Sequence, residues 1–233
     1  QNLFGSKLTA VFHLITADPS PIKNLNLVLR SAYLEAETKV VAGYASGIGC
    51  LDEDEKDIGV VLIEIGGGNT TISTFAHSHL IDVKSIPAGG ILITSDIAKG
   101  LAVSFKEAER IKTLHGSCIH MPSDDRESIH TYLAGEDDEN KAISIVKSEL
   151  VNIVRMRVKE IFELAYAYLE RQNLLPYASK IVLTGGSSEL SGIRELAHEV
   201  FGKNIRLAKP YILNGMPEIT QRPAFSTLVG LLL

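Results

Sequence analysis

The sequence predicts an α/β fold in which buried strands end in glycine-rich turns and alternate with helices. Hydrophobic residues make up 45% of the 233 residues, enough to bury a core. Two short apolar runs, 59–65 and 180–184, are each followed directly by consecutive glycines. Between them, apolar residues recur every three or four positions over 142–172, which predicts a long amphipathic helix. Strands and helices that alternate in this way are typical of α/β domains.

The first part of the chain predicts a small α/β unit. A β-rich run covers 8–16, a helical pattern covers 24–36, and a second apolar strand is expected at 39–44. The acidic stretch 51–57 is expected to be a solvated helix end and loop, and it marks a boundary in the chain.

The rest of the chain predicts a hairpin followed by helices and two further strands. Alternating polar and apolar residues at 70–75 follow the run 59–65 after a glycine turn. The stretch that begins at Ser104 carries a capping-box signature. The remaining expected elements are a strand at 79–86, helices at 94–101, 104–114 and 187–201, and a strand at 204–208.

Composition excludes several classes of protein. The chain has 23 Lys and Arg against 28 Asp and Glu, a net charge of −5, so we expect no nucleic acid partner. Cys50 and Cys118 lie far apart and are expected to be reduced. The histidines show no metal-ligand spacing. The chain starts at Gln1 and closes on an apolar run, so we expect it to be a piece of a longer protein.

The first motif with a chemical interpretation is the glycine turn after the strand 59–65. Gly66, Gly67 and Gly68 leave backbone N–H groups open to a phosphate, and Asn69 and Thr70 follow them. Glu64 precedes the turn and could hold Mg²⁺ through water, or form a structural ion pair instead. An ordinary hairpin turn is the alternative for the whole motif.

The second motif is the turn after the strand 180–184. Gly185 and Gly186 come before Ser187 and the expected helix, so backbone amides and a helix N-terminus could surround a polar ligand. A tight strand–helix connection is the alternative. Gly89 and Gly90 form a third glycine turn, and three such turns together favour ligand binding.

These motifs resemble those of the actin, Hsp70 and sugar-kinase superfamily, and within it the sequence is similar to the FtsA family. The segments that carry the resemblance are IPAGG at 86–90, TSDIA at 94–98, EAERIK at 107–112, HG at 115–116 and KIVLTGG at 180–186. VFHLITA at 11–17, DEDEK at 52–56 and STLVGL at 226–231 agree in the same order. The stretch 118–140 matches poorly.

The resemblance implies an actin-like (ribonuclease H-like) ATPase fold. Residues 1–38 resemble part of an FtsA-type 1C subdomain, and 39–57 resemble the end of subdomain 1A. Residues 58–103 and 178–233 resemble subdomain 2A, into which 104–177 is inserted as subdomain 2B. The N-terminal phosphate-binding strands and the C-terminal membrane-targeting helix of the family are not in this sequence.

The resemblance also implies ATP and Mg²⁺ as ligands. The implied nucleotide-binding residues are Gly66, Gly67, Gly68, Asn69, Thr70, Gly89, Gly90, Glu109, Lys112, Gly185, Gly186 and Ser187. Glu64 is the implied metal residue, through water. The family usually has Asp at position 64, often Thr at 69 and often Asp at 71, so Glu64, Asn69 and Thr71 are departures that affect metal binding and hydrolysis most.

The implied function is cell division at the cytoplasmic face of the inner membrane, at the septum. Arg157 matches the place where the family binds the C-terminal tail of FtsZ. Further implied partners are a second copy in an actin-like filament, other divisome proteins through 1C, and the membrane through the helix not in this sequence. Weak ATPase activity at most is expected. The alternatives are a sugar-kinase-like phosphotransferase and a pilus-assembly actin homologue.

Overall fold

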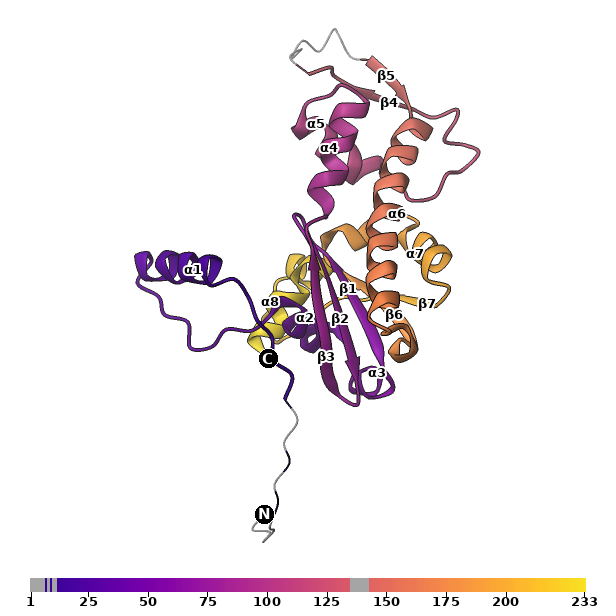
Figure 1. The fold of residues 1–233 in the computed structure, drawn as a ribbon. Helices are drawn as coiled ribbons and strands as arrows, with labels where there is room; N and C mark the ends of the chain where they lie inside the picture. The colour runs from indigo at the N-terminus through magenta and orange to yellow at the C-terminus, as the bar shows by residue number, and fades with distance from the viewer. Residues whose placement is uncertain (1–6, 8, 10–11, 135–142) are drawn as a thin grey trace. The chain divides into compact units, whose positions relative to one another are not determined.

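The computed structural model describes residues 7, 9, 12–134 and 143–233, which form two compact units, 1–40 and 41–233 (Figure 1). In the first unit, α1 spans Pro19–Ser31 and begins after Asp18, whose side chain accepts a hydrogen bond from the Ser20 amide. This cap, with proline in the first turn, makes the helix begin earlier than the predicted position 24. The predicted strand at 8–16 is wrong for its described residues, which have no regular secondary structure.

A five-stranded mixed sheet is the centre of the second unit (Figure 1). Its order is β3-β2-β1-β6-β7. The strands are β1 (Val60–Ile65), β2 (Thr70–Ala76), β3 (His79–Ile86), β6 (Lys180–Thr184) and β7 (Asn204–Leu207). The first three form antiparallel pairs, whereas β1, β6 and β7 run parallel. All five were predicted within one or two residues.

The three central strands of the sheet, β2, β1 and β6, are buried on both faces, whereas the edge strand β3 is largely exposed or half-buried. Val61, Ile63 and Ile65 of β1 belong to the larger core, whereas Val60 and Leu62 point into a smaller cluster on the other face. Burial on both sides explains why β1 is continuously apolar rather than alternating. The helices whose residues pack into the larger core are α4 (Gly90–Gly100), α5 (Phe105–His115), α6 (Lys147–Arg171) and α7 (Ile193–Phe201).

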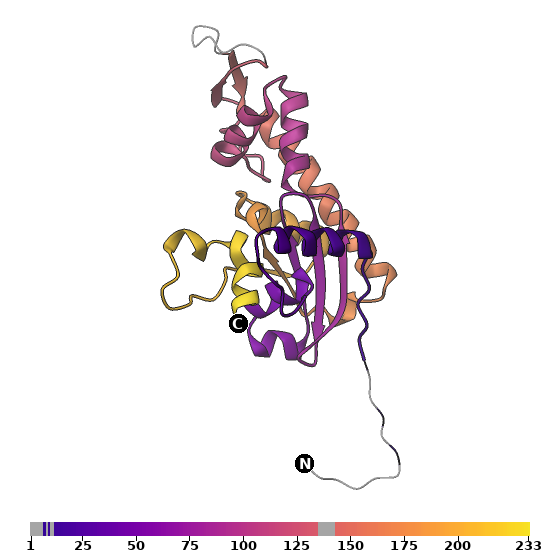
Figure 2. The same ribbon diagram turned by 90° about the vertical axis from the view of Figure 1, so that its left-hand side faces the viewer.

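A smaller part of the second unit extends beyond one end of the sheet (Figures 1 and 2). It contains α5, the far half of α6 and the antiparallel pair β4 (Ser128–Thr131) and β5 (Ile143–Val146). The strand β5 takes the place of the first turn predicted for the long helix. Because α6 has 25 residues, it reaches from this part to the sheet.

The predicted strand at 39–44 is wrong, because helix α2 begins at Ala42 and continues to Cys50. Its glycines have little helix propensity, but they allow very close packing. A Cβ on Gly43 would lie 2.0 Å from Ser73 Oγ of β2. On the other side, a Cβ on Gly230 of α8 (Ser226–Leu232) would lie 1.7 Å from the Ala45 carbonyl. Packing between β2 and α8 therefore makes this segment helical.

The acidic stretch 51–57 is also less solvated than predicted. It forms α3 (Glu53–Ile58), which starts with a capping box. Glu55 is buried and accepts hydrogen bonds from Arg206, at 2.5 and 2.7 Å, and from Lys180 at 3.2 Å. Burial acts to raise the pKa of Glu55, but Arg206, the Asp52 amide and Lys180 together outweigh it, so the pKa is lowered.

The remaining elements are short 3-10 helices: η2 (Leu175–Tyr177), η3 (Gly186–Glu189), η4 (Glu218–Gln221) and η5 (Pro223–Phe225). No helix in the described part of the chain is both long enough and apolar enough to cross a membrane.

Candidate functional site

A hollow of about 810 Å³ lies where the turns after β1 and β6 meet α4, α5 and η5. Its lining residues come from two separate stretches of the second unit, 67–116 and 186–225. The lining residues are Gly67, Gly90, Ile91, Phe105, Glu109, Lys112, Thr113, Leu114, Gly116, Gly186, Ser187, Glu189, Leu190, Ser191, Arg222, Ala224 and Phe225. This volume is within the range of pockets for small molecules and cofactors.

Two of the glycine turns pack backbone against backbone. The Gly90 amide donates to the Gly66 carbonyl at 2.9 Å, and the Ile91 amide donates to the Gly67 carbonyl at 2.8 Å. A Cβ on Gly89 would lie only 2.6 Å from the Gly66 carbonyl oxygen. Only glycine at position 89 permits this approach, which places the N-terminus of α4 beside the β1–β2 turn.

The third turn closes onto the same place. Gly185 has φ +87°, and a Cβ there would lie 2.5 Å from the Ile65 carbonyl oxygen. The position therefore requires glycine for two reasons, the positive φ and the close backbone contact. The next residue, Gly186, lines the hollow with an open side, its nearest neighbour being the Ala224 side chain at 3.7 Å from an added Cβ. The three glycine turns therefore meet at one site, as the sequence predicts.

Next to the turn formed by Gly89 and Gly90, α4 and α5 contribute a polar network. Glu109 Oε2 accepts hydrogen bonds from Thr94 Oγ1 at 2.5 Å and from Lys112 Nζ at 2.8 Å. The Glu109 side chain is 50% exposed and that of Lys112 only 12%. Burial acts to raise the pKa of Glu109, but the bonds from Lys112 and Thr94 outweigh it, so the pKa is lowered and the carboxylate stays ionised.

The predicted nucleotide residues divide into two groups. Those that line the hollow are Gly67, Gly90, Glu109, Lys112, Gly186 and Ser187. Those that support its walls are Gly66, Asn69, Thr70, Gly89 and Gly185, whereas Gly68 is exposed and does not line the hollow. In the second group, Thr70 Oγ1 donates to the Ala88 carbonyl at 2.7 Å and Asn69 Nδ2 donates to Ser85 Oγ at 3.0 Å. These two side chains therefore connect the start of β2 to β3 and to the segment that follows β3.

Glu64 lies outside the lining of the hollow. It alternates with Ile63 and Ile65 along β1, and its Oε1 accepts a hydrogen bond from Thr227 Oγ1 of α8. Its buried Oε2 has no hydrogen-bond partner, and no Lys or Arg pairs with it within the described residues. Burial raises the pKa of Glu64, and the Thr227 hydrogen bond offsets only part of this. Nowhere in the described ranges do three or more His, Cys, Asp or Glu gather as a metal site.

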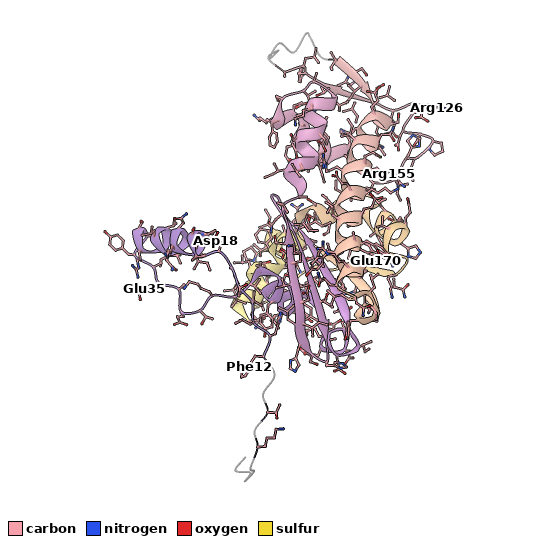
Figure 3. The ribbon with its side chains drawn as sticks, in the orientation of Figure 1. Phe12, Asp18, Glu35, Arg126, Arg155 and Glu170 are labelled. Atoms are coloured by element: carbon pink, nitrogen blue, oxygen red, sulfur yellow. The ribbon has the colours of Figure 1, made fainter. Side chains whose placement is uncertain are left out.

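Arg157 lines a second hollow of about 690 Å³, in a groove between α4 and α6. Its guanidinium pairs with Asp96 of α4 and with Glu160 one turn along α6, each at 2.5 Å. The bond to Asp96 raises the pKa of Arg157 further. Arg155, labelled in Figure 3, instead donates from its Nη2 to both carboxylate oxygens of Glu199 on α7, at 2.7 and 3.0 Å. Arg155 and Arg157 thus pair with carboxylates on two different helices, α7 and α4.

Several lining residues were not predicted from the sequence. Arg222 forms a bidentate pair with Glu189 across the hollow, at 2.7 and 3.1 Å. Phe105 and Phe225 add aromatic surface from α5 and η5. No spacing in the sequence connects these residues, because they come from three separate segments and only the fold brings them together.

The chain matches one protein family over most of its length. The model of the family described as "Cell division protein FtsA" matches residues 61–230. A curated cell division protein FtsA of Rhizobium meliloti (strain 1021) is 38% identical over 232 residues, which is 99% of this chain and 52% of that protein. The Bacillus subtilis (strain 168) protein of the same name is 33% identical over 100% of this chain and 51% of its own length. The chain therefore spans about half the length of these relatives.

Solved structures show that the fold is actin-like. The chain is similar to MreB5 of Spiroplasma citri bound to ADP, with a TM-score of 0.71 and 19% identity over 90% of this chain and 63% of that one. A type IV pilus biogenesis complex, PilM-PilN, matches with a TM-score of 0.68 and 16% identity over 92% of this chain and 57% of that one.

Proposed function

This chain belongs to the FtsA family of cell division proteins, and from that premise we propose that its hollow binds the adenosine and phosphates of ATP. The observation that carries the proposal is the meeting of three glycine turns at one hollow. Gly67, Gly90 and Gly186 line it without side chains, so a phosphate can approach the backbone closely. Because the Gly90 amide already donates to the Gly66 carbonyl, we assign the phosphate to the amides of the turns at Gly67 and Gly186. MreB5, which has a similar fold, was crystallised with ADP.

The polar wall fits the other end of the nucleotide. Glu109 and Lys112 lie on α5, and we assign them to the adenosine side. The ionised Glu109 favours hydroxyl or amino donors and repels phosphate, so the phosphates belong at the glycine turns. Leu190 and Phe225 supply apolar surface for the base.

Glu64 fits a Mg²⁺ ion carried by the phosphates. Its Oε2 is buried without a partner, which costs free energy unless a cation or a water compensates. We assign Glu64 to the metal through water, which is how Mg²⁺ is usually held. The ion would neutralise phosphate charge. The nucleotide then acts as a structural ligand that favours the assembling conformation, with weak hydrolysis at most.

The proposed role of the whole protein is to link FtsZ filaments to the inner face of the cytoplasmic membrane at the septum. The C-terminal tail of FtsZ is assigned to the groove of Arg157, self-association to an actin-like filament, and other divisome contacts to residues 1–38. Membrane attachment is assigned to a segment outside this sequence. We keep the 2A and 2B boundaries at 58–103 with 178–233, and at 104–177. The family match favours this role over a phosphotransferase or a pilus-assembly protein.

Gly186→Val in the full-length protein tests the nucleotide site. The position has no positive φ and an added Cβ meets no heavy atom closer than 3.7 Å, so the fold should tolerate the change while the side chain fills the hollow. Isothermal titration with Mg-ATP should show at least about a tenfold loss, equal to 1.4 kcal/mol, at an unchanged melting temperature. Equal affinity in a folded variant would place the nucleotide elsewhere.

A further inference from the structure

An ion pair spans the groove between α4 and α6. Asp96 extends from α4 and Arg157 from α6, and Asp96 Oδ2 lies 2.5 Å from Arg157 Nε. The two side chains are only 27% and 26% exposed, so water and salt screen the pair less than they would on an open surface. The guanidinium that we assign to a partner is therefore already occupied by a carboxylate of the protein itself.

A second carboxylate holds the same guanidinium. Glu160 Oε2 lies 2.5 Å from Arg157 Nη1, so one positive charge faces two negative charges and the trio carries a net charge of −1. Three acidic and three basic residues line the groove, which therefore has no net positive charge: Asp96, Glu160, Glu163, Lys99, Arg157 and Lys159. An acidic ligand thus meets repulsion as well as attraction here.

The two carboxylates hold Arg157 in different ways. Glu160 is three residues away on the same helix and 53% exposed, so its pair with Arg157 is of the weak surface kind. Asp96 comes from the other helix and is about half as exposed, so a ligand that takes its place must open a contact across the groove. Asp96 is therefore the group with which a ligand mainly competes.

The rest of the groove indicates the kind of ligand. Ile153 and Met156 line it beside Arg157, and Met156 is 69% exposed. A segment that offers a carboxylate to Arg157 and apolar side chains to these two residues matches both features of the groove.

We propose that Asp96 is a competitor built into the groove, which occupies Arg157 in the free protein and which an acidic and apolar peptide must displace in order to bind. This rests on the proposed function, because that function assigns the C-terminal tail of FtsZ to this groove. The apparent affinity is then reduced by the fraction of molecules in which Asp96 has left Arg157. With that fraction at about one tenth, removal of the competitor raises the affinity about tenfold.

The test is the binding of an FtsZ C-terminal tail peptide to the full-length protein, measured by fluorescence anisotropy. Asp96→Asn keeps the size of the side chain and removes its charge, so it should bind the peptide about tenfold more tightly than wild type. Asp96→Ala is the second variant, should Asp96→Asn not fold.

The matched control is Glu163→Gln. It removes the same charge from the lining of the groove, but from a residue that lies 3.8 Å from Lys159 and is 59% exposed. Because solvent and salt screen such a charge, the control should bind the peptide within about twofold of wild type.

A double variant tests whether Asp96 acts through Arg157. In a protein that carries Arg157→Met, the change Asp96→Asn should no longer tighten binding, because no guanidinium is left to release. A tenfold gain that persists in the Arg157→Met protein would overturn the proposal, as would a gain of the same size in Glu163→Gln.

The remaining outcomes separate this proposal from the assignment of the groove. A folded Asp96→Asn protein that binds the peptide no better than wild type overturns the competition, while a loss of binding in Arg157→Met leaves the groove as the partner site. If Arg157→Met changes nothing, either alone or together with Asp96→Asn, the partner site lies elsewhere and both proposals are wrong. Both are also wrong if neither wild type nor Asp96→Asn binds the peptide.

Discussion

Glu64 lies on β1, the strand that leads into the first glycine turn. It is one methylene longer than aspartate, the residue that the family resemblance implies at this position. One of its oxygens accepts a hydrogen bond from Thr227 of α8, and the other is buried without a hydrogen-bond partner. The residue thus connects the sheet to α8, and the second oxygen is the one that we assign to a metal-bound water. The alternative role for Glu64 is a structural ion pair with Lys or Arg. No Lys or Arg within the described residues pairs with it.

Glu64→Gln should therefore not destabilise the protein at neutral pH. The pKa of Glu64 is raised above its usual value of 4.5, so the folded state holds its proton to a higher pH than the unfolded chain does. Stability falls as the pH rises from the usual pKa to the raised one, and glutamine abolishes this slope. The melting temperature of Glu64→Gln should rise relative to that of wild type as the pH increases from 4 to 8. A variant that melts lower by the same margin at every pH would contradict this.

The same variant tests the metal assignment by a separate readout. Glu64→Gln should weaken ATP binding in the presence of Mg²⁺ and leave metal-free binding nearly unchanged, whereas Glu64→Asp should keep the magnesium effect. Magnesium dependence at the wild-type level in Glu64→Gln would assign the residue a structural role only.

Among single residues, glycines were easier to predict than side chains. Gly67, Gly90 and Gly186 follow buried strands or open a helix, and that local context is visible in the sequence. Arg222 and Phe225 have no such context, because the loop that carries them reaches the hollow only through the fold. Glycine turns can thus be predicted from the neighbouring sequence. The part of the hollow lined by Arg222 and Phe225 depends on tertiary structure.

At the scale of elements, the five strands of the sheet were predicted well because their pattern is local, whereas the strands predicted at 8–16 and 39–44 are wrong. A continuous apolar run between turn residues indicates a strand buried on both faces, and β1 and β6 have this pattern. The apolar run at 39–44 predicted a strand where α2 begins, and the three glycines of α2 lower its helix propensity. Its stability comes instead from contact with β2 and α8, which local propensity does not record. The helix α8 was not predicted at all.

The groove between α4 and α6 carries the prediction about a protein partner. Arg157→Glu should weaken binding of an FtsZ C-terminal tail peptide by about 2–4 kcal/mol, because repulsion replaces a charge-assisted hydrogen bond. Fluorescence anisotropy measures this directly. Arg157 is already paired with Asp96 and Glu160, so a partner carboxylate must compete with both.

A matched control makes the groove prediction specific. Arg194→Glu makes the same charge change on an exposed residue of α7 that does not line the groove. It should bind the peptide as wild type does, and both variants should bind ATP normally. Equal binding by Arg157→Glu and wild type would move the partner site elsewhere.

At the scale of the whole molecule, the chain represents about half of the FtsA proteins it matches. The family and the actin-like fold were predicted from short motifs, since each motif fixes a turn whose geometry the fold needs. Because the chain spans only about half of these relatives, we expect the remainder of the protein to contribute to the nucleotide site. Affinity is therefore to be measured on the full-length protein.

The most direct measurement is photolabelling of the full-length protein with an azido-adenine analogue of ATP, followed by mass spectrometry of the labelled peptides. We expect crosslinks within 105–116, 186–191 or 222–225, the segments that line the hollow, and we expect excess ATP to abolish them. Crosslinks that excess ATP abolishes but that fall elsewhere in the protein, with none in these segments, would contradict it.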